Sequence, residues 1–331
     1  MKNLKCSLSI TLLAMAGMGL APAAESAKPV EIRLDYATYN PSSIVLKKQG
    51  WLEEDLKADG ITVRWVFSAG SNKAADMLAS DAADFGSTAG SAALLARANG
   101  VPLKIIYVYS RPEWAQLLVK SDSPIKTVAD LKGKKIAATR GTDPFTLTLR
   151  AVREAGLMPS DVVLVGLQHA EGYQAWQKGS VDAWAALDPF LAKALLVDGA
   201  RPLFSRVSFN TFGVLNVRES FLTQYPAYVE RVIKQYEKAR LWIIAHPDDT
   251  ATALAEAAKI EVKVAQNQLS QRTSLKPEDG VGIPGPLLME SLQGVLPVLV
   301  EEKIAKPGAD PAAALKDLVE AAPATSAIGA K

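Results

Sequence analysis

The sequence is poor in the residues that most metal sites and covalent catalysts require. Its 331 residues include a single cysteine, Cys6, and only two histidines, His169 and His246. Neither histidine has a second histidine or cysteine partner that would complete a zinc site, and one cysteine cannot form an internal disulfide. The phosphate-binding motif G-x-x-x-x-G-K-S/T and the dinucleotide-binding motif G-x-G-x-x-G are also missing. We therefore expect neither a metal nor an organic cofactor.

A long hydrophobic run is absent as well. An apolar stretch at residues 8–20 follows Lys2 and Lys5, but serine, threonine and glycine residues interrupt it. A membrane-spanning helix needs about 20 mainly apolar residues. Positive charge, a short apolar stretch and then the small residues 21–24 form the order typical of a secretory signal peptide. We predict a signal peptide at residues 1–23, cut after Ala23 or up to four residues later, and export to the periplasm.

An excess of charge is missing once the signal peptide is removed. Cleavage removes Lys2 and Lys5, the only charged residues among the first 24, so the formal charge falls from +2 to 0. It also removes Cys6, and the resulting chain without thiols suits an oxidising compartment. No basic excess remains to attract nucleic acid or an anionic membrane. Any preference for anions must therefore come from local geometry.

The remaining chain of about 300 residues exceeds what one hydrophobic core usually serves, so we expect two domains. Strand patterns alternate with helical ones such as residues 73–79 and 147–154, and the strands are predicted at 31–36, 61–67, 84–86, 103–108, 115–119, 135–138, 162–165 and 181–185. This alternation predicts parallel sheets covered by helices on both faces. After about Ser220 the strand patterns stop, and helices are predicted at 225–245, 249–259 and 262–271. The tail at residues 311–331 is predicted to be partly disordered.

One local pattern recurs where predicted strands give way to helices. A residue that can cap a helix stands at Asn40, Asp143 and Asp188, each before a proline, and at Ser71, Ser87 and Thr88. Asn or Asp is a strong N-cap, and proline is preferred at the first helical position. In α/β sheets, ligands bind at the carboxyl ends of strands, where helix N-termini present free N–H groups to an anion. Each of these residues could also be a helix cap and nothing more.

Residues 86–90 (GSTAG) are superficially similar to the nucleophile elbow G-x-S-x-G of hydrolases. Threonine takes the central place, however, and a hydrolase would also need a histidine base late in the chain. His246 precedes Pro247 at the predicted end of a helix, among helices that read as surface elements. We therefore do not expect an acyl-transfer enzyme.

Three segments carry a resemblance to a known family. They are residues 123–137 (SPIKTVADLKGKKIA), residues 181–190 (VDAWAALDPF) and residues 86–88 (GST), the last followed by an Ala-rich helix. Together they resemble the periplasmic aliphatic sulfonate-binding proteins of ABC importers, and the similarity runs from about Pro29 to Pro307. The broader group includes binders of taurine, nitrate and sulfate esters, and the first segment specifies the fold better than the ligand.

The resemblance implies an α/β fold of the type II periplasmic binding class, with two lobes joined by a two-crossover hinge and the ligand cleft between them. Lobe I would comprise residues 24–114 and 215–310, and lobe II residues 115–214. The crossovers would fall near residues 111–116 and 212–216. A monomer would capture an alkyl or aryl sulfonate or a sulfate ester and deliver it to a membrane permease and its ATPase subunits.

The resemblance also implies ligand contacts, which are Asn40, Gly70, Ser71, Ser87 and Thr88 in lobe I and Gly141, Thr142, Trp184 and Asp188 in lobe II. Trp184 would pack against the organic part of the ligand. Arg140 could pair with the oxyanion through two hydrogen bonds, and Arg111 at the hinge is a second candidate. Either arginine could also be a solvated surface charge.

This chain departs from the family pattern in the loops at Asn40, Ala89 and Asp143, so two alternatives stay open. One is a binder of another small anion, such as nitrate, taurine or a carboxylate. The other is an enzyme on the same fold that acts on a small precursor molecule. Relatives of that kind rely on histidine and cysteine residues that a mature chain like this one lacks.

Overall fold

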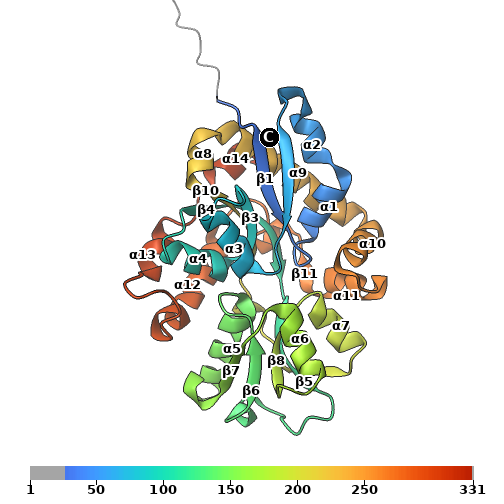
Figure 1. Ribbon diagram of the computed structural model, residues 1–331, viewed down its shortest axis with the longest axis vertical. Coiled ribbons are helices and arrows are strands. Elements are labelled where there is room, and N and C mark those ends of the chain that lie inside the picture. Colours follow the sequence, from blue (N-terminus) through green and yellow to red (C-terminus); the bar gives the residue numbers. More distant parts are fainter. Residues whose placement is uncertain (1–26, 330–331) are drawn as a thin grey trace, which may run out of the picture.

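The structure, a computed structural model, describes residues 27–329. The predicted signal peptide at residues 1–23 lies outside this range. Within the described residues, no helix combines the length and the apolar character needed to cross a membrane. The described chain forms two bodies, one above the other in Figure 1, which we call lobe I (upper) and lobe II (lower).

Lobe I is built on a six-stranded mixed sheet with the strand order β11-β4-β10-β3-β1-β2. β1 pairs in parallel with β2 and β3, whereas β10 runs antiparallel between β3 and β4. The strands are β1 (Glu31–Tyr36), β2 (Thr62–Phe67), β3 (Phe85–Ala89), β4 (Leu103–Pro112), β10 (Gly213–Arg218) and β11 (Thr273–Ser274). The two ends of the chain therefore build this sheet together.

Lobe II is built on a five-stranded mixed sheet with the strand order β7-β6-β8-β5-β9. β6 pairs in parallel with β7 and β8, and β5 runs antiparallel to β8 and β9. The strands are β5 (Ala115–Lys120), β6 (Lys135–Ala138), β7 (Val163–Gly166), β8 (Ala183–Leu187) and β9 (Ala200–Phe204). The chain enters this lobe between β4 and β5 and leaves it between β9 and β10.

Helices cover both sheets (Figure 1). In the first part of lobe I they are α1 (Pro41–Gln49), α2 (Trp51–Leu56), α3 (Ser71–Ala79) and α4 (Gly90–Ala98). In lobe II they are α5 (Asp143–Glu154), α6 (His169–Gln177) and α7 (Phe190–Leu196). The C-terminal part adds α8 (Glu219–Gln224), α9 (Pro226–Ala245), α10 (Pro247–Ala258), α11 (Val262–Arg272), α12 (Pro286–Glu301), α13 (Pro311–Lys316) and α14 (Ala322–Ile328).

The predicted α/β architecture is confirmed, and a strand lies at each of the eight predicted positions. The prediction of purely parallel sheets was wrong, because β5, β9, β10 and β11 pair antiparallel with their neighbours. The last three of these strands were not predicted at all, and β11 lies beyond Ser220, where strands were expected to stop. β9 and β11 are short and only partly buried, so they lack the apolar run that marks a central strand.

The C-terminal tail is more ordered than the sequence predicts. Instead of partial disorder, α13 and α14 form, and α14 packs on α9. Ala324 of α14 is completely buried, and Val319 bridges to Ile105 of β4. Alanine is a strong helix former and lets helices approach closely, so the Ala-rich composition supports packing here.

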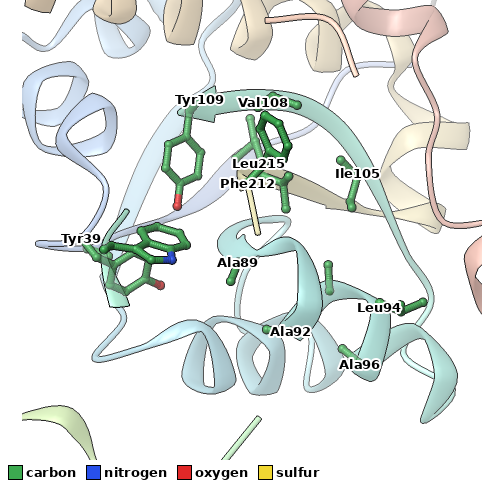
Figure 2. Close-up of a cluster of buried hydrophobic side chains, with 14 of the residues drawn as sticks. Tyr39, Ala89, Ala92, Leu94, Ala96, Ile105, Val108, Tyr109, Phe212 and Leu215 are labelled. Carbon is green, nitrogen blue, oxygen red and sulfur yellow. The ribbon is translucent and has the colours of Figure 1, made fainter. Parts of the chain in front are cut away.

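The core of lobe I reaches the lobe boundary. Figure 2 shows Ile105, Val108 and Tyr109 of β4 above Ala89 and the helix α4, all with buried side chains. The same cluster includes Tyr39, which follows β1. Burial of these apolar groups fixes the ends of the strands that position the site.

Candidate functional site between the two lobes

Two helix N-termini face each other across the lobe boundary. α3 begins after Gly70 in lobe I and α5 begins after Thr142 in lobe II, and neither has a side-chain cap. A Cβ on Gly141 would lie 3.8 Å from the Cβ of Asn72, and a Cβ on Gly70 would lie 3.1 Å from the ring of His169. Gly70, Ser71, Gly141 and Thr142 are therefore brought together. Uncapped helix N-termini offer free N–H groups and a positive dipole end.

His169, the first residue of α6, presents a hydrogen-bond acceptor to this boundary. Thr139 Oγ1 donates to the carbonyl of Leu167 (2.8 Å), so it accepts from Nδ1 of His169 (3.1 Å), and Nε2 carries the lone pair. Nε2 is buried and has no hydrogen-bond partner within residues 27–329. Burial lowers the pKa of His169 to about 3, so the ring is neutral at physiological pH. The sequence analysis considered His169 only as a histidine without a partner that would complete a zinc site.

Asp143 does not cap α5, contrary to the prediction. Thr142 is the N-cap and Asp143 is the first helical residue. One carboxylate oxygen accepts from the hydroxyls of Ser91 (2.6 Å) and Thr211 (2.7 Å). The other accepts from Nε1 of Trp114 (2.9 Å) and the backbone N–H of Thr211 (2.6 Å). Burial raises the pKa of Asp143 and these donors lower it. The carboxylate thus joins lobe II to α4 of lobe I and to both connections between the lobes.

Asp188 forms a second link between the lobes. Its carboxylate pairs with Arg272, the last residue of α11, at 2.8 and 3.1 Å, and both side chains are buried. It also accepts from the backbone N–H of Ala192 (3.0 Å) in the first turn of α7, but the prediction that Asp188 is the N-cap was wrong, because Pro189 takes that position. The prediction that Pro189 opens this helix was wrong, because α7 begins at Phe190. Burial raises the pKa of Asp188, and Arg272 lowers it.

The predicted hydroxyls of lobe I are all hydrogen-bonded within that lobe. Ser87 and Thr88 lie in β3 and do not open a helix, since α4 begins at Gly90. The Thr88 hydroxyl accepts from Nδ2 of Asn216 (2.9 Å), and the Ser71 hydroxyl accepts from the backbone N–H of Ala89 (2.9 Å). These bonds tie the start of α3 to the end of β3.

The Ser87 hydroxyl donates to Asp35, a residue that the sequence analysis did not single out. The carboxylate of Asp35 accepts from the Ser87 hydroxyl (2.8 Å), the Ser87 N–H (2.7 Å) and the Ser68 hydroxyl (2.6 Å). Burial raises the pKa of Asp35 to about 6, although these hydrogen bonds lower it. One feature of the sequence could have indicated this network. Asp35 is a charged residue near the end of a strand that is otherwise largely apolar.

Asn40 caps α1 as predicted and has a further group to offer. Its Oδ1 accepts from the backbone N–H of Ser43 (3.2 Å). Its Nδ2 is buried without a hydrogen-bond partner in the described part of the chain, as are the hydroxyls of Tyr109 and Tyr236. Figure 2 shows the Tyr109 hydroxyl pointing toward Tyr39.

The structure does not bring Trp184 to the other predicted residues. Its side chain is 1% exposed and packs against Gly172, Tyr173 and Trp176 in the core of lobe II. The indole at the lobe boundary is Trp114, which meets Tyr39 edge-on with ring centroids 5.9 Å apart. Trp114 is therefore the tryptophan placed to contact a molecule held between the lobes.

The two candidate arginines lie at different places. Arg140 is exposed, with its guanidinium 5.4 Å from the ring centre of Phe145. Arg111 lines a groove of about 870 Å³ at the hinge, together with Arg272 and the ends of α9 and α11. Across residues 27–329, no three His, Cys, Asp or Glu side chains cluster in a way that could hold a metal ion.

Comparison with known proteins agrees with this architecture. A family model described as NMT1/THI5 like matches residues 42–250. The chain belongs to this family. A Bacillus subtilis protein named for binding aliphatic sulfonates is 30% identical over 81% of this chain and 82% of the relative. An Escherichia coli protein with the same name is 31% identical over 81% of this chain and 86% of the relative.

Solved structures of sulfonate-binding proteins show the same fold. The periplasmic aliphatic sulphonate binding protein SsuA from Escherichia coli is 27% identical, with a TM-score of 0.72 over 86% of this chain and 91% of that chain. The alkanesulfonate-binding protein SsuA from Xanthomonas axonopodis, bound to MOPS, has a TM-score of 0.79 at 23% identity and covers 89% of this chain and 99% of that chain. The predicted periplasmic binding protein fold and the resemblance to sulfonate-binding proteins are both confirmed.

Proposed function

We propose that this protein is the periplasmic solute-binding component of an ABC importer. It captures an alkyl or aryl sulfonate or a sulfate ester between its lobes and delivers it to a membrane permease. The relatives named for aliphatic sulfonates, which match most of this chain at 30–31% identity, support this ligand class. In this proposal the chain is exported by its signal peptide, acts as a monomer and catalyses no reaction.

The observation that carries the proposal is the meeting of two uncapped helix N-termini, those of α3 and α5, at the lobe boundary. Such N-termini bind anions through backbone N–H groups and the helix dipole, without a cationic side chain. This mode suits a mature chain whose formal charge is zero. The proposed contacts are Asn40, Gly70, Ser71, Gly141 and Thr142, with Trp114 against the organic part.

Asp143 and Asp188 complete the proposal as links between the lobes. Each carboxylate belongs to lobe II and binds groups outside it, namely Ser91 and Arg272. These contacts hold the lobes together, and a ligand captured between the lobes stabilises this closed arrangement further. A binding protein of two lobes closes by hinge motion.

The test is a ligand screen on the mature protein. Sulfonates, sulfate esters, nitrate, taurine and carboxylates are compared by thermal shift, because a ligand raises the melting temperature in proportion to ln(1 + [L]/Kd). We expect the largest shifts from sulfonates or sulfate esters. Larger shifts from another class would overturn the ligand assignment, and turnover of a bound compound would overturn the binding role.

A charge change at Asn40 tests the position of the site. Asn40→Asp keeps the oxygen that caps α1 but replaces the free Nδ2 donor by negative charge, so we expect at least tenfold weaker anion binding. Asn99→Asp is the matched control, because its Oδ1 accepts from the backbone N–H of Lys306 on the far part of lobe I. Equal affinities in both variants would place the site elsewhere.

A further inference from the structure

Several buried hydrogen-bond donors of lobe I have no partner within residues 27–329, and three of them belong to side chains with no exposed surface. These three are the Tyr109 hydroxyl, the Tyr236 hydroxyl and Nδ2 of Asn40. A buried polar atom without a partner is unfavourable, and folded proteins retain few of them. Three in one region call for a common explanation.

The three donors come from different elements but lie close together. Tyr109 belongs to β4, Asn40 caps α1, and Tyr236 lies on α9, which packs against both elements. Burial raises the pKa of Tyr109 and of Tyr236, and the charge of Asp35 raises each further. The amide of Asn40 is near enough to the Tyr236 hydroxyl to lower its pKa. The three donors therefore lie in one part of lobe I, near Asp35.

This region lies directly behind the lobe boundary. The Tyr109 hydroxyl points toward Tyr39 (Figure 2). The ring of Tyr39 meets Trp114 edge-on. Trp114 donates to Asp143 of lobe II, and the charge of Asp143 also raises the pKa of Tyr109. Gly213 leaves the space that the ring of Tyr109 occupies, because a Cβ on Gly213 would overlap this ring. Separation of the lobes would break the hydrogen bond between Trp114 and Asp143.

Asp35 does not satisfy the three donors. Its two carboxylate oxygens accept from Ser68 and Ser87 instead, at distances of 2.6 to 2.9 Å. Its negative charge nevertheless acts on any anion held beside it, and a doubly charged anion is repelled twice as strongly as a singly charged one.

We propose that the hydroxyls of Tyr109 and Tyr236, with Nδ2 of Asn40, bind the oxygens of a singly charged, three-oxygen head group, as in a sulfonate or sulfate ester. This inference rests on the proposed function and names the side chains that hold the head group. Such a head carries no proton near neutral pH, so it accepts hydrogen bonds and donates none, which matches a set made of donors. A carboxylate offers only two oxygens, and Asp35 repels a doubly charged head twice as strongly as a singly charged one.

Removal of single hydroxyls tests the inference. Tyr109→Phe and Tyr236→Phe keep the ring and delete one donor each. We expect each variant to bind butane-1-sulfonate and phenyl sulfate at least tenfold more weakly in titration calorimetry. In the ligand-free protein the same changes remove an unsatisfied polar atom, so the melting temperature should hold or rise. Affinity and stability thus move in opposite directions.

Tyr107→Phe is the matched control, two residues earlier on β4. Its hydroxyl donates to Glu237 (2.8 Å), so its loss should lower the melting temperature and leave the affinity unchanged.

The outcomes separate the inference from the proposed function. If the wild type binds either probe and Tyr109→Phe and Tyr236→Phe bind it equally well, the inference is wrong and the proposed function stands. If the wild type binds no sulfonate or sulfate ester, both are wrong. A melting temperature that falls in these variants as far as in Tyr107→Phe would show that the hydroxyls already have partners, which also overturns the inference.

Discussion

Replacing Asp143 measures how strongly one carboxylate holds the lobes together. Its two oxygens face different kinds of donor. One faces the hydroxyls of Ser91 and Thr211, and the other faces Nε1 of Trp114 and the backbone N–H of Thr211. A hydroxyl can rotate to accept a hydrogen bond, whereas an indole or backbone N–H can only donate. The two oxygens therefore differ in what can replace them.

This difference predicts unequal costs for two substitutions. In Asp143→Asn, Oδ1 can face Trp114 and the backbone of Thr211 while Nδ2 donates to the two hydroxyls. Every hydrogen bond is then kept, and only the extra strength that the negative charge gives these bonds is lost, which lowers the free energy of unfolding by about 1 kcal/mol. In Asp143→Leu, two buried N–H groups lose their acceptor at about 1–3 kcal/mol each, which gives a loss of about 4 kcal/mol in the free energy of unfolding.

Urea unfolding of the mature protein provides the measurement, with the free energy extrapolated to water. Asp122→Leu is the control, because Asp122 is exposed in lobe II and should change stability by less than about 0.5 kcal/mol. The reasoning is refuted if Asp143→Asn costs as much as Asp143→Leu, or if Asp143→Leu costs less than about 1 kcal/mol.

Three other changes have defined outcomes. Arg272→Met leaves the Asp188 carboxylate buried and unpaired, so the free energy of unfolding in urea should fall by about 3–5 kcal/mol. The double variant with Asp188→Leu should regain most of this loss. Equal losses in the single and the double variant would contradict this reasoning. The raised pKa of Asp35, about 6 against an ordinary 3.8, means that the folded protein holds this proton more tightly than the unfolded chain. Stability from this group is therefore present below about pH 4 and is lost as the pH rises to about 6, by about 3 kcal/mol in all. A wild type and an Asp35→Asn variant that change in parallel over this range would refute the assignment. Gly70→Ala places a Cβ 3.1 Å from a ring of lobe II, so ligand affinity in titration calorimetry should fall at least about fivefold, whereas Gly166→Ala, with contacts no closer than 3.7 Å, should not change it.

Local patterns in the sequence predicted eight of the eleven strands in the described residues and the start of α1, because capping and side-chain periodicity depend on residues a few positions apart. Asn40 before Pro41 is an example, since its cap on α1 uses only Ser43. β10 could not be predicted in the same way. Its central residue Asn216 is stabilised by hydrogen bonds to Gly86 and Thr88, some 130 residues earlier in the chain.

The candidate site shows the same limit. Asp143 and Asp188 looked alike as capping residues before a proline, yet both mainly bind groups outside lobe II. The partner of Asp188 is Arg272, which lies 84 positions away. Trp184 lies within a predicted strand and Trp114 directly precedes one, and only the tertiary fold decides that Trp184 is covered by α6 while Trp114 meets the other lobe.

The antiparallel insertion of β10 between β3 and β4 determines the order in which the molecule can be assembled. Lobe II is a single continuous stretch, so its sheet needs no residue beyond Phe204. The sheet of lobe I has a gap at its centre until Gly213–Arg218 arrives, and Val319 bridges to Ile105 only near the end of the chain. Contacts of such long sequence separation slow folding, because the loop must close before they form. Lobe II can therefore fold early and on its own, whereas lobe I stays incomplete and open to degradation until nearly the whole chain is available.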